Sequence, residues 1–187
     1  KAMEAGFDDA KLDPETKLSW DLWKRQHEDA RDGLAFLGNS YRFDQMNGAQ
    51  SFLPTFLINF HKVDDEKDYL AYVARLQKVG VAFDQLLERA QASATKGIRP
   101  PKFAYEGVIE QSRKVIAGAP FDDGKDSALW ADAQAKADAL AKDGKITAAR
   151  AAELKELARK ALLDTVKPAY EKVIAFATDE LPKAAVN

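Results

Sequence analysis

The sequence predicts an all-α fold, an antiparallel bundle or array of long helices with a kinked C-terminal helix. Apolar residues recur at steps of three and four along most of the chain, which is the period of a helix with one buried face. The stretches between these patterns are short and contain the glycine, proline and capping residues that begin and end helices. With 187 residues, 46% hydrophobic and 31% charged, the chain can form a core with a solvated exterior.

The chain begins with a polar stretch, residues 1–12, that has no sustained period. We interpret it as a loosely ordered lead-in to a single helical domain over residues 13–187. Asp13 and Pro14 predict the first helix start, since a short acidic side chain can cap a helix and proline fits its first position.

An apolar stripe follows at steps of three and four, and Gly38 ends it. Its members are Trp20, Trp23, His27, Ala30, Leu34 and Leu37. Because a buried tryptophan covers a large area and needs one hydrogen-bond partner, we expect both tryptophans to be core anchors rather than ligand contacts.

The next stretch, Asn39 to Gln50, breaks the period. Irregular segments on a scaffold often carry function, but a surface crossover is the interpretation we favour. From Ser51 to His61 the pattern predicts a short helix with Phe52, Phe56 and Phe60 on one line. These rings could floor a pocket, although a buried helix is the better interpretation.

The longest helical pattern begins at Asp64 and Asp65, which can accept hydrogen bonds from free backbone N–H groups. Gly97 can close this helix in the left-handed conformation, and Pro100 and Pro101 forbid its continuation. Its stripe runs through Tyr69, Val73, Leu76, Gly80, Phe83, Leu87, Ala90 and Ala94. The glycine on the stripe marks either a close helix contact or a bend.

The remaining sequence predicts a helix ending near Gly118 and then an antiparallel helical hairpin. Its two helices span about 127–142 and 147–181, joined by a tight connection. Pro168 lies inside the apolar pattern of the last helix. Because proline removes one backbone hydrogen bond, we expect a kink over 164–168 rather than a helix end.

Composition excludes several function classes. A net charge of -2 gives no indication of binding to nucleic acid through neutralised phosphates. There is no apolar run near 18 residues, so no membrane span is predicted. The chain has no cysteine, which excludes disulfides and thiolate metal sites.

The two histidines do not complete a recognised metal motif. His27 and Glu28 resemble the start of a zinc peptidase helix, but Arg31 stands where the second imidazole is required. His61 has neither Glu nor His three or four residues away, so it cannot form the pair of a di-iron bundle. We therefore predict no metal, no cofactor and no catalytic residue in this chain.

Several short motifs together carry a family resemblance. They are Lys17–Leu22, Gln45-Met46-Asn47-Gly48, Leu53-Pro54, Asp68–Leu76, Gly97-Ile98-Arg99-Pro100-Pro101 and Val166–Tyr170. In this order they resemble the N-terminal half of the bacterial family called "domain of unknown function 885". The resemblance covers nearly the whole chain.

The resemblance implies a function that resides partly outside these residues. Members are secreted or lipid-anchored, much longer, and similar to zinc-dependent peptidases with a helical gluzincin-like fold. Their zinc motif, His-Glu followed by Pro-Gly-His-His, belongs to the C-terminal half. We therefore expect a non-catalytic helical N-terminal segment of an exported peptidase, in the periplasm or cell envelope, that helps to shape a peptide-binding cleft. Its partners would be the C-terminal segment and a peptide, and zinc would belong to the full-length protein.

Within that interpretation, four residues are candidates for substrate binding. Tyr41, Gln45 and Asn47 lie in the irregular stretch, and Arg99 lies in a mildly basic corner of the chain. If the chain is a segment, an exposed apolar patch is expected on the last helix, where a partner would pack.

Two other functions remain open. The first is a free-standing helical binding or scaffold protein without enzymatic activity, favoured by the long amphipathic stripes. The second is a metal-independent enzyme that uses carboxylates such as Asp44 or Glu106.

Overall fold

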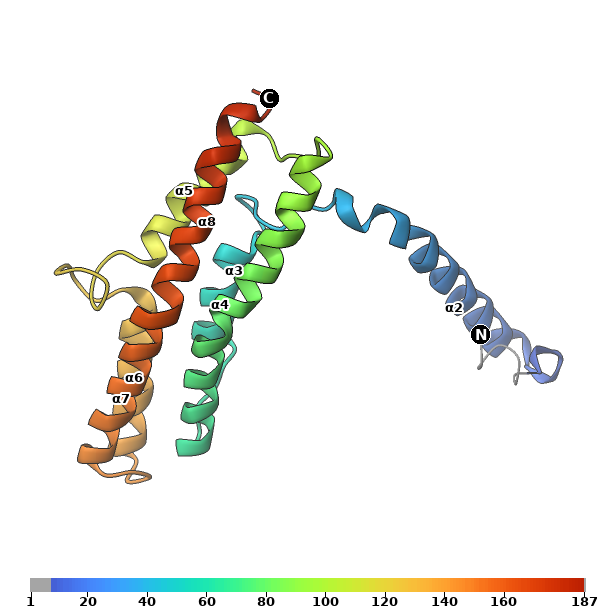
Figure 1. Ribbon diagram of the computed structural model, residues 1–187. Coiled ribbons are helices and arrows are strands. Elements are labelled where there is room, and N and C mark those ends of the chain that lie inside the picture. Colours follow the sequence, from blue (N-terminus) through green and yellow to red (C-terminus); the bar gives the residue numbers. More distant parts are fainter. Residues whose placement is uncertain (1–7, 187) are drawn as a thin grey trace. The chain divides into compact units, whose positions relative to one another are not determined.

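The computed structural model describes residues 8–186, and its regular secondary structure in that range consists of helices without a strand (Figure 1). This confirms the all-α fold class. Contacts group the chain into two compact units, residues 1–40 and 41–187, and each is described by itself. The predicted lead-in, residues 1–12, is described only from Asp8, where a 3-10 turn, η1 (Asp9–Lys11), follows. That residues 13–187 form a single domain stays a prediction.

The first unit contains helix α2 (Pro14–Gly33) and the 3-10 helix η2 (Leu34–Asn39). The Asp13 side chain caps α2 by accepting hydrogen bonds from the next turn, as expected. None of the residues of α2 and η2 is buried. The expectation that Trp20 and Trp23 are core anchors is therefore wrong. Their rings stack on each other at 5.0 Å, and Trp23 stacks on His27 at 5.6 Å. Within residues 8–40 there is no second α-helix to cover them.

The second unit contains the remaining helices. They are α3 (Ala49–Asn59), α4 (Glu66–Thr95), α5 (Lys102–Val115), α6 (Ala128–Lys142), α7 (Ala148–Ala161), the π-helical turn η3 (Leu162–Val166), α8 (Lys167–Glu180) and the 3-10 turn η4 (Leu181–Lys183). Asp65 and Thr147 cap α4 and α7, and Gly97 has a φ of 80°, so the predicted boundaries are confirmed.

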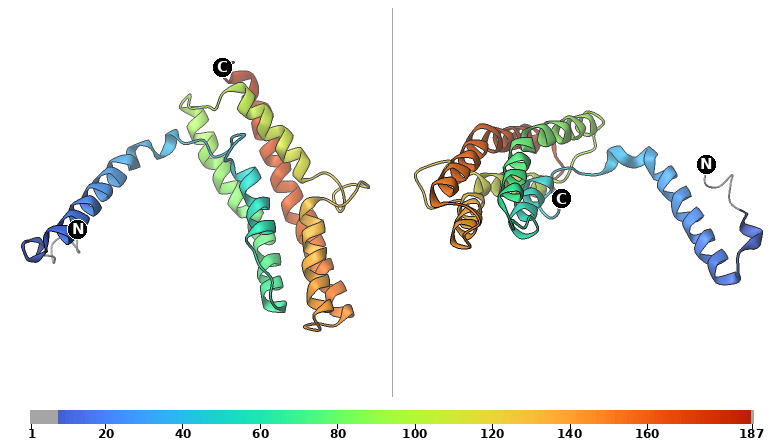
Figure 2. Two further views of the ribbon diagram at one scale, coloured as in Figure 1. Left: turned by 180° about the vertical axis from the view of Figure 1, so that it is seen from behind. Right: turned by 90° about the horizontal axis from the view of Figure 1, so that it is seen from below.

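A continuous rod made of α7, η3 and α8 organises this unit (Figures 1 and 2). Helix α4 packs along the rod, α5 packs on α8, and α6 packs on α7 as the second half of the predicted hairpin. Where a kink over 164–168 was predicted, the structure has the π turn η3, and the helix continues through it, as expected, rather than ending. Proline has no N–H to donate, and the wider turn accommodates the missing hydrogen bond.

The core lies between α4, the rod, α5 and α6. Tyrosines cross it: the Tyr69 hydroxyl donates to the Ala133 carbonyl at 3.0 Å, and the Tyr170 hydroxyl donates to the Gln50 carbonyl at 2.7 Å. A Cβ on Gly80 would lie 3.3 Å from the methyl carbon of Thr165. Of the two alternatives for Gly80, the close helix contact is therefore the observed one.

Helix α3 has the opposite orientation to the one expected. Phe52 and Phe60 are 65% and 68% exposed, whereas Pro54 and Leu57 are buried. This helix is apolar on both sides, so the period alone could not identify its buried face. The exposed apolar patch expected on the last helix is not observed either, since Leu157 is the one large apolar residue that the described range 147–181 exposes.

Candidate functional site

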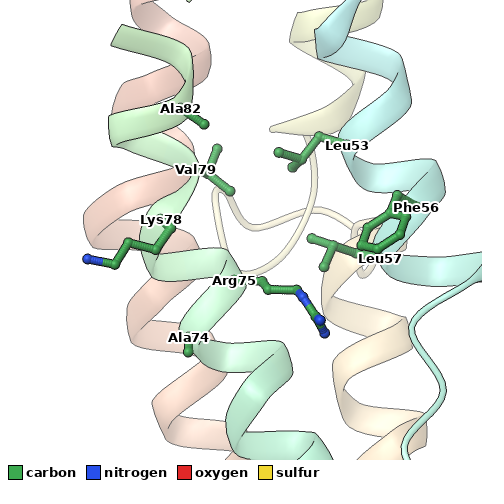
Figure 3. Close-up of a pocket in the computed structure, with 8 residues that line it drawn as sticks. All are labelled: Leu53, Phe56, Leu57, Ala74, Arg75, Lys78, Val79 and Ala82. Carbon is green, nitrogen blue, oxygen red and sulfur yellow. The ribbon is translucent and has the colours of Figure 1, made fainter. Parts of the chain in front are cut away.

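An open apolar groove separates α3 from α4 and encloses about 380 Å³ (Figure 3). Helix α3 packs mainly on α5 and α6, which leaves its other side open toward α4. The lining is apolar except for two cations. It consists of Leu53, Phe56, Leu57, Ala74, Arg75, Lys78, Val79 and Ala82.

A ladder of phenyl rings extends this groove along α3. Phe52, Phe56 and Phe60 follow one another at i, i+4 spacing, and their ring centroids are 6.2 and 6.4 Å apart. Residues four apart lie on one face of a helix. The groove and the exposed rings beside it therefore form one continuous apolar surface.

The two cations of the groove, Arg75 and Lys78, have no acidic neighbour on their own helix. On α4, residues three and four away from either are alanine, tyrosine, valine or the other cation. Helix α3, which faces them, carries no charged residue at all. Arg75 extends toward Phe56 and Leu57, whereas the Lys78 ammonium points away from α3 (Figure 3). The groove thus has an uncompensated positive charge at one edge.

His61 holds Arg75 in this position. The Arg75 guanidinium donates to Nδ1 of His61, and its Cζ lies 6.0 Å from the centroid of the Phe56 ring. Since Nδ1 accepts, the proton of the neutral imidazole is on Nε2, which donates to the Asp68 carbonyl at 3.1 Å. The structure records no hydrogen bond from Nε or NH2 of Arg75 to any residue of 8–186, so these donors can bind a ligand.

The four predicted substrate-binding residues do not line this groove. Arg99 pairs with Glu180 at 2.6 Å. Burial, and then the charge of Glu180, raise the pKa of Tyr105 to about 12. Arg99 and Tyr41 are close enough to change this pKa as well, Arg99 by lowering it and Tyr41 by raising it. Gln45 places its backbone against α5, and the backbone N–H of Asn47 donates to Asp44 at 2.7 Å. Their role in substrate binding stays a prediction.

The irregular stretch is a packed crossover held by amide side chains. Gln111 donates to the Gln45 carbonyl at 2.8 Å and accepts from Gln50 at 2.8 Å, and Gln50 donates to the Asp44 carbonyl at 2.6 Å. A Cβ on Gly107 would lie 2.6 Å from the Cβ of Gln45, so only glycine allows this approach. These contacts anchor the stretch on α5.

The two carboxylates considered for metal-independent catalysis are not brought together. One oxygen of Asp44 accepts from the backbone N–H groups of Met46 and Asn47, both at 2.7 Å, which stabilises a local turn. Glu106 lines a separate surface depression formed with the end of the rod.

The described residues do not form a metal centre. Within 8–186, no group of three or more His, Cys, Asp or Glu side chains is arranged to hold a metal ion. His61 has both ring nitrogens hydrogen-bonded within the protein, and His27 stacks on a tryptophan. The zinc of the resembling family therefore has no fitting ligand set here. No helix in this range is both long and apolar enough to cross a membrane.

Comparison with known proteins identifies the family. A family model described as "Bacterial protein of unknown function (DUF885)" matches residues 1–187. The chain belongs to this family. This confirms the resemblance carried by the ordered motifs. No curated protein matches the DUF885 chain.

One solved structure has the same fold as this DUF885 chain. It is described as "the putative lipoprotein from Colwellia psychrerythraea", with a TM-score of 0.70 and 20% sequence identity. The alignment covers 78% of this chain and 24% of that protein. The DUF885 chain therefore spans about a quarter of the length of its structural neighbour.

The groove was not among the sequence predictions. Its walls come from residues 53–57 and 74–82, which are brought together by contacts of α3 with α5 and α6. One sequence signal pointed to it: the phenylalanine line on α3, interpreted as buried. A helix with no charge and apolar residues on both sides has a second face that needs a partner.

Proposed function

We propose that this chain is the helical, non-catalytic N-terminal segment of a longer, exported zinc-dependent peptidase, and that it forms one wall of the cleft that binds the peptide. The observation that carries the proposal is the α3–α4 groove, with an apolar floor and free cationic donors at one edge. Peptides bring both apolar side chains and backbone carbonyls to such a surface.

Three further observations support the proposal. The family model spans the whole chain, and the structural neighbour is about four times as long as the matched segment, so a further part of the protein could carry zinc. The printed description of that neighbour as a lipoprotein agrees with a location in the cell envelope. The described residues offer a binding surface and no metal ligand set.

The test compares two alanines on α4. Ala74 lines the groove and Ala71 does not, although both are exposed. We expect Ala74→Trp to fill the groove and weaken the binding of a fluorescent peptide library at least about tenfold, and Ala71→Trp to leave binding unchanged. Fluorescence anisotropy on the purified chain measures both. Equal binding by the two variants, or no binding by the unmodified chain, would overturn the proposal.

Catalysis is tested on the full-length protein. We expect a zinc chelator to abolish hydrolysis of the same peptides. We expect Ala74→Trp to raise KM and leave kcat nearly unchanged, because the variant alters binding rather than chemistry. Hydrolysis by residues 1–187 alone would contradict the non-catalytic role.

A second function, a helical binding or scaffold module without enzymatic activity, is favoured by the closed core of residues 41–187. Buried residues from Phe43 to Ala177 form one continuous cluster. If the full-length protein binds peptides but does not hydrolyse them, this second function is the correct one.

A further inference from the structure

We infer that the α3–α4 groove selects peptides in which a bulky apolar residue stands next to an acidic residue. This inference rests on the proposed peptide-binding function and specifies its substrate class. It follows from two properties of the groove, the unbalanced charge and the shape of the apolar surface.

The charge of the groove favours an anion. Arg75 and Lys78 are three residues apart on α4, where like charges repel. Neither cation has a recorded ion pair among residues 8–186, and Asp132 on α6 is paired with Lys136 at 2.6 Å. A ligand carboxylate would relieve the repulsion, and the free Nε and NH2 donors of Arg75 offer the forked geometry that carboxylates accept.

The Arg75 guanidinium is held in place before a ligand arrives. The hydrogen bond to His61 and the contact with the Phe56 ring fix it at the groove edge. A preorganised guanidinium loses less conformational entropy on binding than a free one. Lys78 has a flexible stem, so its ammonium can turn toward a bound anion. His61 is thus a positioning residue for the carboxylate site.

The apolar part of the site lies directly beside this guanidinium. Phe56 and Leu57 from α3 and Val79 from α4 form the floor close to Arg75 (Figure 3). Since the side chains of Leu or Phe would fill this floor, the adjacent position of the same peptide would reach Arg75. An apolar side chain alone would leave the cations uncompensated, and a carboxylate alone would make no contact with the apolar floor.

Four labelled tetrapeptides test the inference on the 187-residue chain. They carry Leu-Asp, Leu-Asn, Leu-Lys or Ala-Asp at their centre and have amidated C-termini. We expect the Leu-Asp peptide to bind at least about tenfold more tightly than each of the other three. Its affinity should fall as NaCl is raised from about 0.05 to 0.5 M, because an exposed ion pair is screened.

Substitutions of the groove residues test which of them recognise the ligand carboxylate. Arg75→Gln and Lys78→Glu should each reduce the preference for Leu-Asp over Leu-Asn to less than about twofold, and His61→Phe should weaken Leu-Asp binding while leaving Leu-Asn binding unchanged. Lys67→Glu, on the exposed first turn of α4 and outside the groove, is the matched control and should keep the preference.

The outcomes separate the inference from the function on which it rests. If all four peptides bind equally and Ala74→Trp weakens them all, the peptide-binding function stands and the carboxylate selectivity is wrong. If no peptide binds, both are wrong. If decanoate, a single apolar chain with a carboxylate, displaces a fluorescent fatty acid while no peptide does so, the groove is a lipid site and the inference is overturned.

Discussion

Gly107 is the residue at which the irregular stretch meets α5. A methyl group there would overlap with Gln45, whose Cβ would be 2.6 Å from the new Cβ. We expect Gly107→Ala to lower the free energy of unfolding by about 1–3 kcal/mol through overpacking, despite the higher helix propensity of alanine. Urea unfolding followed by circular dichroism measures the change.

A second substitution shows whether the overlap is the cause. Adding Gln45→Gly to Gly107→Ala removes the opposing Cβ, so at least half of the lost stability should return. A double variant no more stable than Gly107→Ala would show that the overlap with Gln45 is not responsible.

Glu180 makes the stability of the fold depend on pH in the acidic range. The carboxyl is 3% exposed; burial raises its pKa, but hydrogen bonds from Lys183 and Arg99 outweigh burial and hold the pKa below its ordinary value of 4.5. The unfolded chain therefore binds this proton more readily than the folded one. The contribution to stability is present above pH 4.5 and is lost as pH falls below 4.5 through the folded pKa.

Glu180→Gln tests this dependence. We expect it to lower stability at neutral pH by about 1–3 kcal/mol and to flatten the fall in stability below pH 4.5. Glu171→Gln, an exposed residue of the same helix without a recorded ion pair among residues 8–186, is the control and should keep the wild-type pH profile. Urea unfolding at a series of pH values measures both.

Residues whose role is local could be predicted from sequence, and those with distant partners could not. Asp13, Asp65 and Thr147 were identified as helix starts because a cap bonds to the next turn of its own chain segment. The bond from Gln111 to Gln45 spans 66 positions. No local pattern shows which distant carbonyl an amide side chain will meet.

At the scale of elements, α3 has two apolar sides with different roles. Leu57 is 2% exposed and lies in the core cluster, so Leu57→Ala should cost about 2–5 kcal/mol. Phe60→Ala should change stability by less than about 0.5 kcal/mol, since its ring is on the surface. Thermal unfolding of the two variants measures this, and a comparable loss for both would place the phenyl ladder in the core instead.

The π turn has a signature in the spacing of buried residues. One line of them runs along the rod through Leu154, Ala158, Leu162, Val166 and Tyr170, with Ala161 and Ala169 buried beside it, and then continues at alternating steps of three and four. The three steps of four residues from Ala158 to Tyr170 add up to 12 positions. Three turns of a regular α-helix contain about 10.8 residues. Pro168 led us to predict a kink over 164–168, whereas this spacing is typical of a π turn.

At the scale of the whole molecule, the second unit has a buried cluster of its own. Among the described residues 8–186, its members lie at or beyond Phe43. We expect a chain that begins at Tyr41 to retain its helical content and a Tm within about 3 °C of the full chain. Differential scanning calorimetry measures this, and loss of the cooperative transition would show that residues 1–40 contribute to the core.

The fold class of this chain could be predicted from sequence, but the groove could not. Helical periods determine which residues form each helix, whereas a groove depends on the distance that other contacts impose on two helices. Helices α3 and α4 are separated because α3 packs on α5 and α6. That arrangement results from the packing of apolar faces that are distant in sequence. The period of a helix does not show which other helix its apolar face will contact.

The extra residue in the turn Leu162–Val166 also determines where along the rod the fold can tolerate a one-residue deletion. Deleting one residue there would leave 11 positions between Ala158 and the tyrosine of the rod, close to the ~10.8 of three regular turns. The two halves of the rod would keep their orientation, and a plain α-helix would replace the π turn. Relatives one residue shorter at this point should therefore share the same buried stripe, whereas a deletion in α7 or α8 would rotate one half out of the core.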